Sequence, residues 1–216
     1  KIGVCFEENG TRFPGYVSSL LVIGDTLYVG GAFNKAGDIS SNSIAGYNIK
    51  TNTWFKLSNE GIISQDNPFP IVLSMAKFNE YIVIGGAFIE GNTKNNNLVF
   101  FSPQSNSFIN LYGNANDVVR AISASDSILY VGGSFTKIGL DSLESSKIAM
   151  MIEGEWMKMG EGIGMLNEEE ETLADVWSLF TYSDGVVVGG RFNRAGNLQT
   201  TSLAKFSNNI WSVPNF

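Results

Sequence analysis

Histidine is absent from the 216-residue chain, and cysteine occurs once, at Cys5. Without histidine, Ser–His–Asp and Cys–His catalysis are excluded within the chain, and the commonest ligand of transition metals is missing. A single cysteine cannot form an intramolecular disulfide, so a disulfide scaffold is excluded as well. The sequence therefore predicts no catalytic, cofactor or metal site, and the chain is not expected to be an enzyme.

Positive charge and long apolar runs are also scarce. Lys and Arg number 14 against 21 Asp and Glu, which gives a formal net charge of −7. A protein that binds duplex nucleic acid needs a basic surface to neutralise phosphates, and the sequence has no basic stripe. No apolar run reaches the roughly 18–20 residues of a membrane-spanning helix. We expect no nucleic-acid partner and no membrane span in this segment.

Proline is rare, with 5 residues, whereas glycine is abundant, with 24. Together with frequent Asn and a charged fraction of only 16%, this composition predicts many tight turns between short strands. The hydrophobic fraction of 44% suits a folded core and argues against disorder. The composition therefore favours an all-β protein.

Four segments repeat one template built around Gly-Gly-x-Phe. The repeated residues are Gly30, Gly31 and Phe33; Gly85, Gly86 and Phe88; Gly132, Gly133 and Phe135; and Gly189, Gly190 and Phe192. Before each pair lies an apolar segment and a turn residue, which together predict a hairpin. After each Phe come a polar loop, a third strand and a fourth strand that carries an aromatic residue. These aromatic residues are Trp54, Phe108, Trp156 and Trp211.

Four short antiparallel strands in about 50 residues are typical of one blade of a β-propeller. The predicted blades span residues 16–62, 63–115, 116–164 and 165–216, and the last includes an acidic insertion. Residues 1–15 are expected to be the outer strand and linker of a preceding blade, with Val4-Cys5-Phe6 as that strand. This favours an excerpt of a larger propeller, and a complete four-bladed ring is the alternative.

The glycine pairs are expected to act through sterics, because inner strands of a blade approach neighbouring backbone closely and a side chain would forbid the approach. The aromatic residue of each fourth strand should supply a large apolar contact between blades. A phosphate-binding role for the glycines is excluded because no helix follows them.

The pattern resembles kelch repeats, in which a Gly pair is followed by an aromatic residue and later by a Trp. Six residues separate Tyr47 from Trp54, as in kelch repeats, but only four separate Met151 from Trp156. The fuller Gly-Gly-x-Phe form is similar to the repeats of large cell-surface proteins such as fungal cortical polarity-marker proteins. The resemblance implies a non-catalytic β-propeller module that offers a protein-binding or structural surface, in a secreted or cell-surface protein.

Two alternatives stay open, an intracellular kelch-type adaptor and a propeller enzyme that uses carboxylates. A protein or glycan partner is expected on the face with the long loops, which are residues 34–43, 89–97, 136–147 and 193–202. Lys35, Lys137 and Arg194 occupy matching loop positions and could bind an anion, although solvated loop charges are the simpler interpretation. Glu168–Glu171 could bind a cation, although a solvated insertion is favoured. Asn9-Gly10-Thr11 is a candidate N-glycosylation site.

Overall fold

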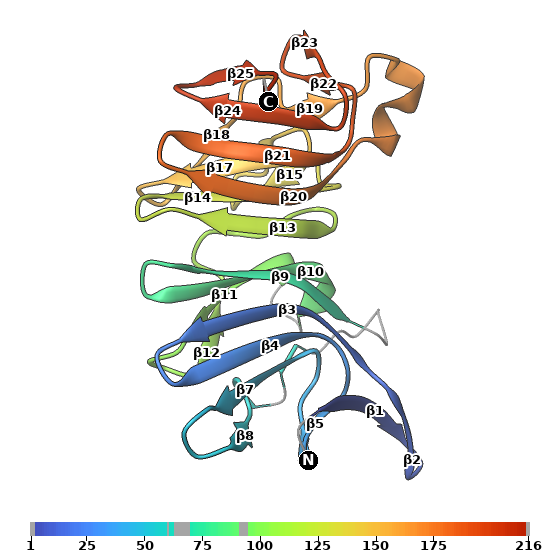
Figure 1. Cartoon of the computed structure of the whole chain (residues 1–216), viewed down its shortest axis with the longest axis vertical. Helices are drawn as coiled ribbons and strands as arrows, with labels where there is room; N and C mark the ends of the chain where they lie inside the picture. Colours follow the sequence, from blue (N-terminus) through green and yellow to red (C-terminus); the bar gives the residue numbers. More distant parts are fainter. Residues whose placement is uncertain (1–2, 60, 63–69, 91–94, 215–216) are drawn as a thin grey trace. The chain divides into compact units, whose positions relative to one another are not determined.

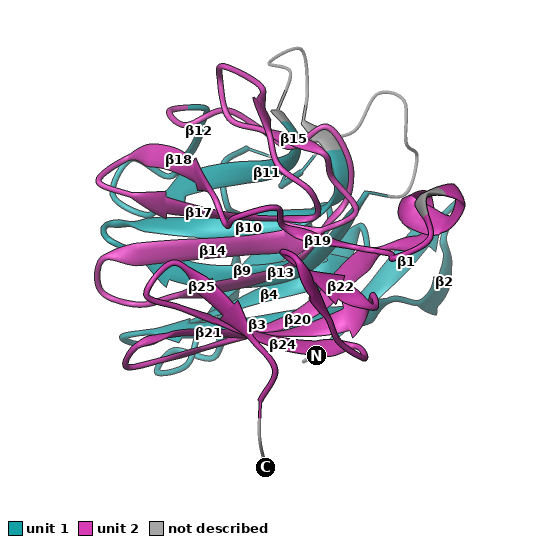
Figure 2. Cartoon of the chain, turned by 90° about the horizontal axis from the view of Figure 1, so that it is seen from above, with its two compact units in different colours: residues 1–110 teal, residues 111–216 magenta. Residues whose placement is uncertain are grey.

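The computed structural model describes residues 3–59, 61–62, 70–90 and 95–214, except for the side chains of Ile89, Glu90, Asn95 and Glu168. The chain divides into two compact units, residues 1–110 and 111–216 (Figure 2). Strands dominate both units, and the only regular helical segment described is the short 3-10 helix η2 (Glu168–Leu173). The chain is an all-β protein, as its composition predicts.

Unit 1 contains two four-stranded antiparallel sheets in which sequential strands pair, here called meanders 1 and 2 (Figure 1). Meander 1 consists of β3 (Tyr16–Ile23), β4 (Thr26–Ala32), β7 (Ile44–Asn48) and β8 (Thr53–Phe55). Meander 2 consists of β9 (Ile71–Phe78), β10 (Tyr81–Glu90), β11 (Asn95–Ser102) and β12 (Ser107–Ile109). The first strand, the Gly-Gly strand, the third strand and the aromatic strand thus follow the predicted order.

Unit 2 contains meanders 3 and 4, which have the same strand order. Meander 3 consists of β13 (Val119–Ala124), β14 (Ile128–Gly133), β17 (Ile148–Ile152) and β18 (Glu155–Lys158). Meander 4 consists of β20 (Asp175–Tyr182), β21 (Gly185–Arg191), β24 (Leu203–Ser207) and β25 (Ile210–Ser212). The repeated template therefore produces four sheets of one topology.

Short strands form smaller sheets beside the meanders. In unit 1 they are β1 (Val4–Glu8), β2 (Thr11–Pro14), β5 (Lys35–Ala36) and β6 (Ile39–Ser40). In unit 2 they are β15 (Lys137–Ile138), β16 (Leu143–Glu144), β19 (Ile163–Gly164), β22 (Arg194–Ala195) and β23 (Leu198–Gln199). The pairs β5–β6, β15–β16 and β22–β23 are hairpins inside the predicted long loops.

The second glycine of each pair lies against backbone of the first strand of its own meander. A Cβ on Gly31 would overlap the carbonyl oxygen of Tyr16, and a Cβ on Gly133 would overlap that of Val118. The close approach coincides with a β-bulge, a shift of register that recurs in all four meanders. The predicted steric role is therefore met within one sheet, and the extra residue of the bulge is what brings the two backbones together.

In meanders 1 and 3, the first glycine of the pair faces the following meander of the same unit. A Cβ on Gly30 would lie within 3.0 Å of the Val72 side chain, and a Cβ on Gly132 would lie equally close to that of Val176. Around these contacts the two sheets of each unit share a core, in which Tyr28 and Ile44 pack with meander 2 and Tyr130 and its neighbours pack with meander 4. Phe33, Phe88, Phe135 and Phe192 are buried.

The Trp side chains attach the fourth strand to the linker that precedes its meander. Trp156 Nε1 donates a 2.8 Å hydrogen bond to the Tyr112 carbonyl, and Trp211 Nε1 donates a 2.7 Å hydrogen bond to that of Met159. Each indole also lies against the glycine of its long loop, Gly139 or Gly196. Trp54 Nε1 is buried without a described partner. The Trp156 and Trp211 indoles thus hold linker and sheet together. The ring contacts of Trp54 with Tyr47 and of Trp211 with Phe206 lie within one meander, and the contact between blades stays a prediction.

The linkers pair with the loop hairpin of the meander that follows them. β19 pairs with β22, with Ile163 opposite Ala195, and β1 pairs with β5 in the same manner, with Val4 opposite Ala36. β1 and β2 therefore form a hairpin that joins the loop of meander 1, and they do not extend any described meander as an outer strand. The strand predicted at Val4-Cys5-Phe6 is present as β1. It lies in the linker position and not in that of an outer strand, because β5 pairs with one of its edges and β2 with the other.

Candidate functional site

The predicted long loops are ordered by hydrogen bonds to the linkers. The Asn34 side chain accepts a 2.7 Å hydrogen bond from Glu7 N and donates one to Glu7 O. Asn193 accepts a 2.6 Å hydrogen bond from Leu166 N in the corresponding place. In meander 3 the asparagine belongs to the linker instead of the loop. The Asn116 side chain accepts hydrogen bonds from the backbone N–H groups of Thr136 and Lys137. These asparagine side chains therefore fix the loop and linker backbones to each other. Residues 91–94 of the second loop lie outside the described residues.

The three loop cations are each paired with a nearby carboxylate. Lys35 Nζ lies 2.9 Å from Glu7 Oε2, and Lys137 Nζ lies 2.9 Å from Glu144 Oε1. Arg194 Nη2 lies 3.0 Å from Glu171 Oε1. The hydrogen bonds from Lys35 and then from Arg12 lower the pKa of the Glu7 carboxyl. These pairings agree with the simpler interpretation of structural loop charges, and the matching side chain of Glu90 lies outside the described residues.

The acidic run takes part in local structure. Glu171 Oε2 accepts a 2.7 Å hydrogen bond from Met165 N, while Oε1 faces Arg194. Asn167 caps η2 through a hydrogen bond from Glu169 N. Among the side chains that the structure describes, which exclude Glu168, no group of three or more acidic or cysteine residues could hold a metal ion. Glu171 thus orders the linker before meander 4.

Asn9 lies with Gly10 in the turn between β1 and β2, and both residues are exposed. Their φ angles are 49° and 77°, so the Asn-Gly sequence is explained by a two-residue hairpin turn with left-handed backbone. Exposure in a turn is what an N-glycosylation acceptor requires, and modification of Asn9 stays a prediction.

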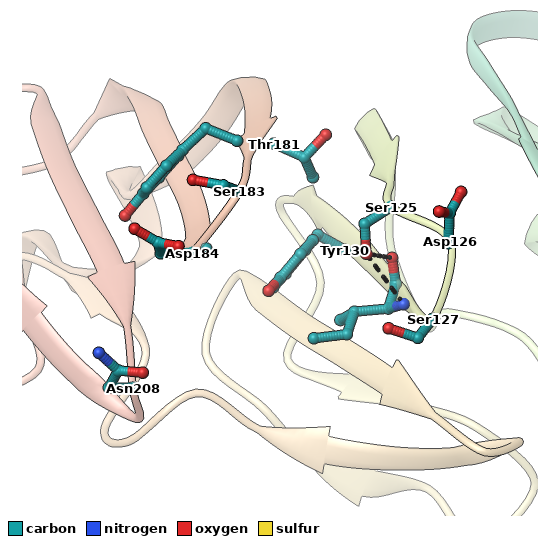
Figure 3. Close-up of a pocket in the computed structure, with 11 residues that line it drawn as sticks. Ser125, Asp126, Ser127, Tyr130, Thr181, Ser183, Asp184 and Asn208 are labelled. Atoms are coloured by element: carbon teal, nitrogen blue, oxygen red, sulfur yellow. Dashed lines mark hydrogen bonds between the residues drawn. The ribbon is translucent and has the colours of Figure 1, made fainter.

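A cleft of about 740 Å³ opens in unit 2 at the short turns, at the opposite end of the strands from the long loops (Figure 3). Its walls are the turn at 125–128 with Tyr130 of meander 3, the turn at 181–185 of meander 4, and Asn208 from the β24–β25 turn. The volume lies within the range of about 300–1,000 Å³ that is usual for small-molecule sites. The sequence analysis did not predict a site here.

Hydrogen bonds between β13 and β20 fix the two walls of this cleft, here called the turn cleft. Ser123 Oγ lies 3.1 Å from Thr181 Oγ1 and accepts a 3.2 Å hydrogen bond from Thr181 N. Thr181 Oγ1 also donates to the Ala124 carbonyl. These hydrogen bonds therefore fix the positions of the two turns that carry polar side chains of the cleft.

Two tyrosines give the turn cleft its distinctive chemistry. Tyr130 is only 4% exposed, and its hydroxyl makes no hydrogen bond to another described residue. The Tyr182 hydroxyl is buried and also lacks a described partner, while Lys205 Nζ lies 4.8 Å from the centre of the Tyr182 ring. Figure 3 shows Asp184 and Asn208 across the cleft from Tyr130 and Ser127, with the Asp126 carboxylate directed away from them.

The turn cleft could have been found by comparing the residues at matching positions of the four repeats. Relative to the glycine pair, Tyr182 corresponds to Phe78 in meander 2, and Gly185 corresponds to Tyr81. Meander 4 thus has a phenol in place of a phenyl ring and a glycine in place of a bulky aromatic residue. Small and polar substitutions at turn positions leave room and hydrogen-bonding groups, which is how a repeat scaffold acquires a site.

Stability at alkaline pH reports on Tyr130. Burial raises the pKa of the Tyr130 phenol, and repulsion from Tyr182 adds to the rise. The phenol therefore contributes stability fully below its unfolded pKa of about 10, and this contribution is lost as the pH rises through the higher folded pKa. We expect urea unfolding between about pH 9 and 11 to show a steeper loss for the native chain than for Tyr130→Phe. Superimposable pH profiles would contradict this.

In the described part of the chain, no helix has the length and apolar character needed to cross a membrane. No family model and no curated protein sequence matches the chain. Similar solved structures exist. The crystal structure of the computationally designed Ika4 protein has a TM-score of 0.51 and 12% identity, over 82% of this chain and 86% of that chain. The computationally designed Ika8 protein has a TM-score of 0.52 and 12% identity, over 94% of this chain and 48% of that chain. At this identity the likeness concerns the fold alone.

Proposed function

We propose that the four meanders are blades of a kelch-like β-propeller, and that the chain is a non-catalytic module of a secreted or cell-surface protein that offers a binding surface. Support for blades comes from the four identical strand orders and from the glycine and Trp contacts that recur between sheet, loop and linker. Such residues build a rigid scaffold, and scaffolds of this kind carry function in their loops and turns.

The observation that carries the binding role is the turn cleft, where polar side chains from three turns meet on a hydrogen-bonded base. The long-loop face remains a second place for a protein partner, because Leu140 is 68% exposed there at the tip of a loop whose flanks are tied to the linker. An exposed apolar side chain on an ordered loop is suited to a protein contact.

The full chain can be tested against an array of defined neutral glycans and synthetic peptides, with mass spectrometry of the probes afterwards. We expect reversible retention of at least one class of probe, recovered unchanged. A chemically altered probe would show an enzyme, and the absence of any retention would reject the binding role. Asp184→Asn in the turn cleft and Leu140→Ser on the long-loop face then assign the face, since only one of the two should weaken retention.

A further inference from the structure

We propose that the turn cleft binds one sugar unit of a neutral glycan. This inference rests on the proposed binding function and specifies its ligand class. The groups involved are the hydroxyl of Tyr130, the carboxylate of Asp184 and the amide of Asn208, and Tyr182 also lines the cleft. The ligand is defined by the hydrogen bonds that these groups leave unmade.

The two phenols are the first argument. A hydroxyl group held away from water without a partner costs about 1–3 kcal/mol in proteins. Tyr182 is in this position, and the Tyr130 hydroxyl reaches the same cleft from a side chain that is almost wholly buried. Neither hydroxyl makes a described hydrogen bond within the fold, and the Tyr130 hydroxyl, which faces the cleft, is the one that a bound molecule can reach.

The balance of donors and acceptors is the second argument. Phenol and serine hydroxyls and the Asn208 amide each donate and accept, whereas the Asp184 carboxylate only accepts. A sugar hydroxyl also donates and accepts, so adjacent sugar hydroxyls can satisfy such a lining completely. An ammonium or guanidinium group only donates, and it would leave the donors of Tyr130 and Asn208 without an acceptor.

Charge argues for a neutral sugar. The described lining includes two carboxylates, Asp126 and Asp184, and no Lys or Arg; Lys205, the cation described beside it, lies against the Tyr182 ring. An acidic sugar would therefore be repelled. The cleft volume of about 740 Å³ accommodates a sugar unit with room for the next one at the open side. The corresponding positions of meander 2, with Phe78 and Tyr81, offer neither the phenol of Tyr182 nor the space at Gly185.

The probes are the methyl glycosides of mannose, glucose, galactose and N-acetylglucosamine, titrated into the full chain and followed by NMR. At least one is expected to bind. Asp184→Asn should raise its Kd about tenfold, and Tyr130→Phe should raise it several-fold, because each loses a hydrogen bond to the ligand. Asp25→Asn is the matched control. It makes the same change of charge at the corresponding turn position of meander 1, outside the lining of the cleft, so the Kd should stay within about twofold.

The possible results separate the two proposals. If no glycoside binds while a peptide is retained on the array, the sugar site is wrong and the binding function stands. If N-acetylarginine amide binds instead, and Asp184→Asn weakens its binding in a salt-dependent manner, the ligand is a cation and the sugar site is wrong. If a glycoside binds and is hydrolysed, the sugar site is correct and the non-catalytic function is wrong.

Discussion

Gly190→Ala is expected to cost about 3 kcal/mol or more of the free energy of unfolding, measured by urea titration. The new Cβ would overlap the backbone carbonyl oxygen of Asp175 and would lie within about 3.1 Å of the backbone at Val176 and Trp177. Backbone atoms of a paired strand cannot rotate aside as a side chain can. The substitution must therefore open the bulge between β20 and β21 or push the strands apart.

The preceding residue provides a matched control. A Cβ on Gly189 would lie 2.8 Å from Ser178 Oγ, and its next neighbour would be 4.0 Å away. The serine hydroxyl can adopt another rotamer, so Gly189→Ala should stay within about 1 kcal/mol of the native chain. Equal losses of unfolding free energy for the two variants would contradict a special role of the second glycine in the backbone contact. They would indicate that β21 tolerates no side chain at either position.

Much of the fold was predictable because the residues of the repeat have strong local preferences for strands and turns. The apolar run, the turn residue and Gly-Gly-x-Phe indicate the order of the four strands, and all four meanders have this order. The linkers were not predictable in the same way. The pairing of Val4 with Ala36 joins segments far apart in the chain, and no local pattern states which edge a two-residue strand will meet.

A second feature that the sequence analysis missed is the turn into each third strand. Ser41 and Ser145 are buried, and each hydroxyl donates a 2.6 Å hydrogen bond to the carbonyl three residues on, at Ile44 or Ile148. Thr200 makes the same bond to Leu203. A Ser or Thr three positions before the third strand was visible in these repeats. Its role was not, because the burial of a short polar side chain depends on the tertiary structure around it.

The turn cleft was missed for a related reason. The repeat directs attention to what its copies share, whereas the cleft arises from differences between copies, at Tyr182 and Gly185. Elaborate loops suggested a site at the other end of the strands, yet much of their polar chemistry is used to hold the linkers, as Asn34 and Asn193 do. In a repeat protein, the unusual residue at a shared position therefore deserves as much weight as the long insertion.

Trp211→Ala is expected to cost about 3–5 kcal/mol of unfolding free energy. The indole is 7% exposed, lies 4.9 Å from the Phe206 ring and donates its N–H to the Met159 carbonyl. Removing it would leave a cavity beside Gly196 and would release the linker before meander 4. Urea titration of the full chain measures the loss, and Trp211→Phe, which keeps most of the ring packing, should lose about 1–3 kcal/mol for the unpaired carbonyl.

Trp177→Ala is the matched control, because this tryptophan is 57% exposed on β20 and its Nε1 donates only to the carboxylate of Asp175, which Arg120 also pairs. The same change of residue should cost no more than about 1 kcal/mol there. If Trp211→Phe were as harmful as Trp211→Ala, the hydrogen bond to the linker would be the dominant contribution. If instead Trp177→Ala were as harmful as Trp211→Ala, the attachment of fourth strand to linker would not explain the repeated tryptophan.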